Sequence, residues 1–234
     1  MISRRVSIGI VLFAALTLAE TALADSLLET LLRVAGLTAA PSSLRDPDDR
    51  GAGTIWIAEV DLQRVAPATS DDGYRSPIFS PAGNLIALQG DRVVRVGPDG
   101  ATPVQRLSGA VKLVGFDGRH PDRVVVLRDS PSAPLVVLSL ETGALTPLPY
   151  DAASEAHQRM LAQIRSAQRV YGTTRVFVKT ESKPGLSRRI EWTDVYVQRG
   201  DAAPRNVSNC DGTSCAQPAL SADGRRVAFV KAGS

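Results

Sequence analysis

The stretch Ser76–Leu88, SPIFSPAGNLIAL, has a second copy at Gln217–Phe229, QPALSADGRRVAF. Both copies follow the pattern Pro-x-x-Ser-x-x-Gly-x-x-apolar-Ala-apolar. This pattern predicts a strand, a tight turn in which glycine takes a positive φ, and a second, buried strand. The residues expected to build the turns are Pro77, Ser80 and Gly83 in the first copy and Pro218, Ser221, Asp223 and Gly224 in the second.

Short β-rich runs fill the chain from Thr54 onward. They are Ile55–Val60, Leu85–Gln89, Val93–Val96, Val124–Leu127, Leu135–Leu140, Arg175–Lys179, Val195–Gln198 and Val227–Lys231. Turn signals such as Asp72-Gly73 and Asp99-Gly100 separate them. Many short strands at close spacing indicate an all-β sandwich, barrel or propeller.

The spacing of the turn glycines favours the propeller among these architectures. Glycines at positions 83, 118, 172 and 224 are 35, 54 and 52 residues apart. This spacing suits propeller blades that carry insertions, because each blade is one repeated supersecondary unit.

The repeated motif resembles the TolB-like, WD40-related (PD40-type) propeller repeat, which reads Pro-x-x-Ser-Pro-Asp-Gly-x-x-Ile-Ala-Phe. In that family a strand, an Asp-Gly turn and Arg-Leu-Thr usually follow. Here Val93–Gly100, VVRVGPDG, precedes Gln105-Arg106-Leu107-Ser108. The resemblance covers about residues 54–234 and is strongest in the first and last copies. TolB has a separate N-terminal domain and more blades, so the resemblance implies a relative of its propeller alone.

Strand counting gives a small propeller of about four blades. Complete sets of strands are expected at about residues 74–108, 109–149 and 151–208. The fourth blade would combine Ile55–Asp61 with Arg226–Lys231, so that the two ends of the domain pair and close the ring. Closure would remove the exposed sheet edges that favour aggregation. An open arc or a fragment is the alternative.

The N-terminus has the pattern of a secretory signal peptide, residues 1–24. Two arginines precede the apolar run Val6–Ala19, and Ala22-Leu23-Ala24 places small residues before a cut after Ala24. A short helix at Asp25–Leu37 and a polar linker to Gly53 are expected next. We therefore predict a periplasmic protein without a stable membrane span after cleavage. An uncleaved N-terminal anchor is the alternative.

The two cysteines, Cys210 and Cys215, are separated by four residues. In an oxidising compartment such a pair predicts a disulfide that closes a tight loop. Two thiols without nearby histidine fall short of a four-ligand metal set, so no metal site is predicted.

The longest connections are predicted to share one face of the propeller. They are the insertion Asp151–Arg169, with a helical pattern of Ala156, Met160, Ile164 and Ala167, the hairpin Thr180–Glu191, the Cys210–Cys215 loop and Thr69–Tyr74. Elaborated loops on a rigid scaffold commonly carry binding. The candidate contacts are Tyr74, Lys183, Arg188, Arg189 and Trp192, because arginine, tryptophan and tyrosine dominate interface energetics. The alternatives are that Trp192 packs between blades and that the arginines are only solvated.

The sequence predicts a binding module and not an enzyme. Its two histidines, His120 and His157, lie in an apparent turn and on the predicted helix, without a recognisable nucleophile or carboxylate partner by spacing. No cofactor motif is present, and no basic stripe interleaved with aromatic residues suggests nucleic acid. The resemblance to TolB implies a scaffold that binds another envelope or periplasmic protein. The alternatives are an immunity-type inhibitor of a toxin or envelope hydrolase, and a hydrolase or lyase that uses the propeller funnel.

Overall fold

The computed structural model describes residues 51–117, 120–130, 133–151, 154–186 and 188–233. These residues belong to the second of two compact units, Ala40–Ser234. The predicted signal peptide with its cut after Ala24, the helix at residues 25–37 and the linker to residue 50 lie outside the described residues. No helix in the part of the chain described is long and apolar enough to span a membrane.

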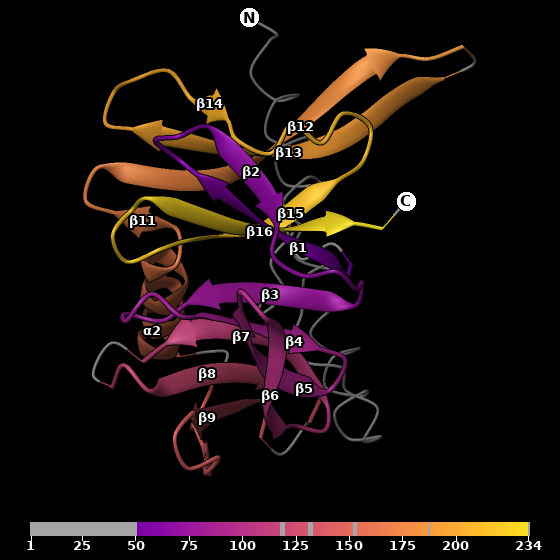
Figure 1. The fold of residues 1–234 in the computed structure, drawn as a ribbon. Coiled ribbons are helices and arrows are strands. Elements are labelled where there is room, and N and C mark those ends of the chain that lie inside the picture. Colours follow the sequence, from indigo (N-terminus) through magenta and orange to yellow (C-terminus); the bar gives the residue numbers. More distant parts are fainter. Residues whose placement is uncertain (1–50, 118–119, 131–132, 152–153, 187, 234) are drawn as a thin grey trace, which may run out of the picture. The chain divides into compact units, whose positions relative to one another are not determined.

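The described chain is mostly β, as the sequence predicts, and its strands form antiparallel sheets (Figure 1). We group them into four sets of four. The first sheet contains β15 (Cys215–Leu220), β16 (Arg226–Ala232), β1 (Gly53–Glu59) and β2 (Arg64–Pro67). The second contains β3 (Tyr74–Phe79), β4 (Leu85–Gln89), β5 (Arg92–Gly97) and β6 (Gly100–Arg106). The third contains β7 (Ala110–Phe116), β8 (Arg123–Arg128), β9 (Leu135–Ser139) and β10 (Leu145–Pro147). The fourth contains β11 (Val170–Tyr171), β12 (Thr174–Pro184), β13 (Arg189–Arg199) and β14 (Arg205–Asn206).

The first sheet joins the two ends of the domain. Strand β1 pairs with β16 in an antiparallel register that runs from Gly53↔Ala232 to Glu59↔Arg226. This confirms the predicted pairing of the terminal strands. A single bridge, Gly53↔Tyr74, connects the first set to the second, so that these eight strands are one continuous sheet; we keep the two names for its halves. None of the sheets formed by the described residues closes on itself, so a closed ring of four blades is not shown.

The two sequence repeats fold into matching turns. Gly83 and Gly224 take positive φ values of 81° and 69°. The Oγ atoms of Ser80 and Ser221 accept hydrogen bonds from the amides of Asn84 (3.0 Å) and Arg226 (2.9 Å), respectively. Each buried serine therefore satisfies a main-chain donor at the start of the second strand, which explains why the motif requires a small hydroxyl residue.

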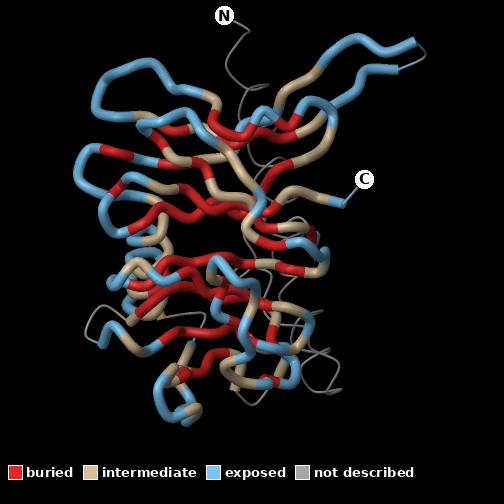
Figure 2. Tube along the Cα trace, viewed as in Figure 1, coloured by how far each residue is buried: buried red, intermediate tan, exposed pale blue. Residues whose placement is uncertain are grey.

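Side chains between successive sheets form three core clusters, and Figure 2 shows the buried residues within the strands. One cluster joins the fourth sheet to the first and includes Val195 and Phe229. The next joins the first sheet to the second and includes Ile55. The last joins the second sheet to the third and includes Leu88 and Val126. The sheets thus stack in the order fourth, first, second, third.

The predicted helical insertion is present as α2 (Glu155–Ala167), which packs against β7. Leu161 is its buried residue, flanked by Met160 and Ile164 in a cluster with the third sheet. Ala156 and Ala167, also placed on the apolar face from the sequence, are exposed. The apolar stripe is therefore rotated toward Leu161, because the longer leucine side chain fills the space against the sheet.

Candidate functional site

The longest hairpin of the described chain forms a two-stranded arm. Strands β12 and β13 pair continuously from Thr174↔Arg199 to Pro184↔Arg189, and the amide of Gly185 donates to the carbonyl of Arg188 across the turn. We call residues 180–193 the arm, and Figure 1 shows it projecting beyond the neighbouring strands. The sequence predicted this hairpin at residues 180–191.

One face of the hairpin alternates cations with aromatic rings. The rings of Phe177 and Tyr196 stack with centroids 6.0 Å apart, and the Lys179 Nζ lies 5.2 Å from the centre of the Tyr196 ring. Nearer the tip, the Lys183 Nζ lies 5.4 Å from the centre of the Trp192 ring. Cation–π attraction of this kind fixes the long lysine side chains over the strands.

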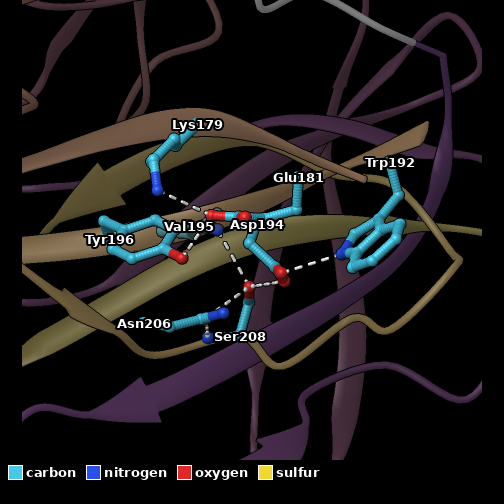
Figure 3. A network of polar contacts seen from close by, with 8 residues as sticks. All are labelled: Lys179, Glu181, Trp192, Asp194, Val195, Tyr196, Asn206 and Ser208. Carbon is cyan, nitrogen blue, oxygen red and sulfur yellow. Dashed lines mark hydrogen bonds and ion pairs between the residues drawn. The ribbon is translucent and has the colours of Figure 1, made fainter. Parts of the chain in front are cut away.

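A buried carboxylate holds the base of the arm (Figure 3). Asp194 is 3% exposed, and its Oδ1 accepts hydrogen bonds from the Ser208 hydroxyl (2.8 Å) and the Cys210 amide (2.7 Å). Its Oδ2 accepts from the Trp192 Nε1 (2.9 Å). Burial opposes ionisation, but these three donors outweigh it and hold the pKa of Asp194 below its ordinary value. The network therefore fixes Trp192 and the start of the disulfide loop to the same strand.

A second carboxylate lies beside this network. Glu181 Oε1 accepts from the Tyr196 hydroxyl (2.5 Å) and pairs with the Lys179 Nζ (3.0 Å). The Tyr196 and Lys179 contacts lower the pKa of Glu181. Conversely, donation to Glu181, together with burial, raises the pKa of Tyr196 to about 12.

Replacing Glu181 with glutamine should shift this tyrosine titration. The E181Q variant removes the charged acceptor, so the pKa of Tyr196 should fall from about 12 toward its ordinary value of 10.0. The Tyr196 Cζ resonance followed against pH measures it, with the Tyr196→Phe variant identifying the signal. A Tyr196 titration that is the same in wild type and E181Q would exclude this hydrogen bond as the cause.

The disulfide loop, residues 210–215, lies against the arm. Cys210 and Cys215 are at disulfide distance, with Cα atoms 6.2 Å apart, in agreement with the sequence prediction. Within the loop, Asp211 Oδ1 pairs with the Lys183 Nζ at 2.7 Å. Both side chains are exposed, so we expect this ion pair to contribute less than about 1 kcal/mol. It nevertheless sets which part of the arm faces the loop.

Three of the four elaborated connections meet through successive contacts. The arm reaches the disulfide loop through Lys183, and the loop carbonyl of Ser214 accepts from the Ala232 amide (2.9 Å). Ala232 pairs with Gly53, beside which the Thr54 hydroxyl donates to Asp72 (2.7 Å) in the 69–74 loop. The helix α2 instead contacts β7 and β11.

The candidate contact residues divide into three groups. Arg188 and Arg189 are exposed at the tip of the arm, where the Arg189 Nε donates to Ser182 Oγ (2.8 Å). Lys183 and Trp192 are engaged in the contacts described above, and Trp192 packs partly into the core. Tyr74 is 3% exposed and packs between the first and second sheets, so we correct its assignment: it presents no side-chain surface to a partner.

The sequence reasoning missed Asp194 and its partner Ser208. A signal was present, because Asp194 interrupts the apolar alternation of the run Trp192–Val197, and a carboxylate in a buried strand requires donors. It also missed Leu186, which is fully exposed at the tip.

A groove of about 880 Å³ lies between the first and second sheets, on the side of the repeat turns. Leu85 and Val96 line it together with Arg64, Arg95 and Arg226. The repeat turns beside the groove are short and regular. The short turns therefore do not make this face flat.

The described residues give little geometric evidence for a histidine-based active site or a metal site. His157 Nδ1 accepts the Asp151 amide (2.9 Å), and the ring stacks on Tyr150. His120 is exposed. Within the ranges described, no group of three or more His, Cys, Asp or Glu side chains could hold a metal ion. The exposed arm is thus the best-defined candidate site.

Comparison of the sequence with models of known protein families and with curated proteins gave no match.

Proposed function

We propose that the chain is a four-bladed, TolB-like β-propeller of the periplasm that acts as a non-enzymatic protein-binding module. Support for the fold comes from the four stacked sets of four antiparallel strands and from the repeated Pro-x-x-Ser-x-x-Gly turn. Support for export comes from the signal-peptide pattern of residues 1–24. The partner is another envelope or periplasmic protein.

The observation that carries the binding role is an exposed, basic arm on a fixed base. Leu186, Arg188 and Arg189 are exposed at its tip, while Asp194 holds its base through three hydrogen bonds. Arginine is enriched at protein interfaces, and the exposed leucine beside the two arginines adds apolar contact area. The rigid base lowers the entropy cost of presenting them.

Site-specific photo-crosslinking in the organism that encodes the protein tests this function. A photoreactive residue replaces Leu186 in the full chain, and adducts are identified by mass spectrometry. We expect a discrete adduct with one envelope protein, and we expect it to be lost when Arg188 and Arg189 are both changed to glutamate.

Leu62 offers a matched control position for this experiment. It is also exposed (72%) but lies between β1 and β2, at the other end of the strands. The same adducts from both positions, or none from position 186, would contradict the proposal.

A further inference from the structure

The outer part of β12 has an unoccupied edge in the described part of the chain. On the side away from β13, its neighbour is β11, which pairs only at Val170↔Arg175 and Tyr171↔Thr174. The remaining strand runs on to Pro184 with β13 as its sole strand partner among the residues described. A strand edge with unpaired main-chain groups is a template for another strand.

The register defines which main-chain groups point outward. The Val176 amide donates to the Arg169 carbonyl, on the side away from β13. Main-chain groups alternate in direction along an antiparallel strand, so those of Thr180 and Ser182 also point away from β13. Thr180 is exposed and Ser182 is half-exposed. Figure 2 shows that the outer part of the arm as a whole is exposed. This edge therefore offers amide donors and carbonyl acceptors to an added strand.

The charge of the β12–β13 hairpin favours one kind of added strand at this edge. The hairpin from β12 through β13 carries six basic and three acidic residues. Lys179 and Lys183 lie on one face of β12 with Glu181 between them. They pair with Glu181 and Asp211, respectively, and their side chains stay 57% and 46% exposed. A second copy of the chain would bring two basic hairpins together, which like-charge repulsion disfavours. An extended acidic segment would instead meet a hairpin with a net charge of +3, which attracts it.

We infer that the edge of β12 at Thr180–Pro184 binds an extended acidic segment of the partner by adding it as a strand. The main-chain groups of Thr180 and Ser182 supply affinity, while the net positive charge of the hairpin favours an acidic strand over a basic one. This inference rests on the proposed binding function and specifies its chemistry.

Amide exchange measured by NMR on the full mature chain tests the inference. The probe is a short synthetic peptide in which glutamate alternates with valine and threonine. We expect it to slow exchange at Thr180 and Ser182 by about tenfold or more. A peptide with lysine in place of glutamate, and one with N-methylated main-chain amides, should give no protection.

The Thr180→Pro variant removes one outward donor but leaves the β12–β13 ladder intact, because the bonds to β13 come from the alternate residues. We expect T180P to weaken peptide binding about tenfold, because one main-chain hydrogen bond is lost. T180A keeps the main-chain amide, so its peptide binding should equal that of wild type. Equal binding of acidic and basic peptides, or undiminished binding by folded T180P, would overturn the inference. Self-association of the chain that T180P abolishes would overturn it as well.

The proposed function can be separated from this inference. If the Leu186 adduct persists in T180P cells, the arm binds its partner without strand addition, and only the inference fails. If the Leu186 adduct is absent while the peptide protects Thr180 and Ser182, the proposed function in the cell fails.

Discussion

Changing Asp194 to alanine is expected to lower the free energy of unfolding by about 3 kcal/mol. The variant removes the acceptor for Ser208, the Cys210 amide and the Trp192 indole, each within 2.9 Å of the carboxylate. The Cys210 amide is buried and would remain without its acceptor, which adds its desolvation cost to the lost hydrogen bonds. Urea unfolding of the mature chain, followed by far-ultraviolet circular dichroism, measures the change.

The Asp211→Asn variant provides the matched control. Asp211 is a carboxylate in the same region, but it is exposed and has one ion-pair partner, Lys183. Its replacement should change the free energy of unfolding by less than about 1 kcal/mol. If D194A and D211N unfold at the same urea concentration, the buried network does not hold the arm.

The acid dependence of stability should change with Asp194 as well. Its pKa lies below the ordinary value of 3.8 in the folded state, so the carboxylate stabilises the fold above that value. This contribution is lost as the pH falls through the lowered pKa. Wild type should therefore lose stability more steeply than D194A below about pH 4. The free energy of unfolding of both proteins is measured between about pH 6 and pH 3. If it falls equally with pH in wild type and D194A, Asp194 is not the group responsible.

The sequence predicted the strands and the terminal pairing because their signals are local and repeated. Gly83 and Gly224 occupy the same place in two copies of one motif, and both take the positive φ that the motif requires. Once the first and last strand runs were seen as parts of one repeat unit, their pairing followed. The observed β1–β16 register extends over the whole of both strands.

The candidate site was predictable only in part, because its contacts join distant parts of the chain. The hairpin and its arginines follow from strand and turn signals, but Asp194 reaches Ser208 and Cys210 across 14 and 16 residues. No spacing rule identifies such donors. Tyr74 was misassigned because residue type alone does not distinguish an interface aromatic from a core aromatic, and only the packing of two sheets buries it.

The contacts at the base give the arm a specific physical role. A two-stranded ribbon is marginal on its own in water. Here the inner half of the hairpin belongs to a four-stranded sheet, and Asp194 joins the base of the arm to the disulfide loop. The Lys183–Asp211 pair links the outer half to the same loop. The arm can therefore expose Leu186 and an unpaired strand edge without unfolding. Loss of the network should loosen the arm before it disrupts the stacked sheets.

Replacing Gly53 with valine is expected to cost about 3 kcal/mol of folding stability. Gly53 begins β1 opposite Ala232, and a Cβ atom at this position would collide with the main-chain carbonyl of Lys231. Main chain cannot rotate away as a flexible side chain can, so the added carbon must separate β1 from β16. Thermal unfolding of the mature chain should show a lower midpoint for G53V.

Gly97 is the matched control for this substitution. It also lies in a strand without a positive φ, and the nearest atom to an added Cβ is 3.9 Å away, an ordinary contact. G97V should therefore keep the wild-type midpoint, since valine is favoured in strands. β1 lies in the first sheet between β16 and β2. Separation of β1 from β16 at Gly53 therefore tests whether the β1–β16 pairing is a main source of stability. A G53V midpoint equal to that of G97V would mean that β2 and the core around Ile55 hold β1 without its bonds to β16.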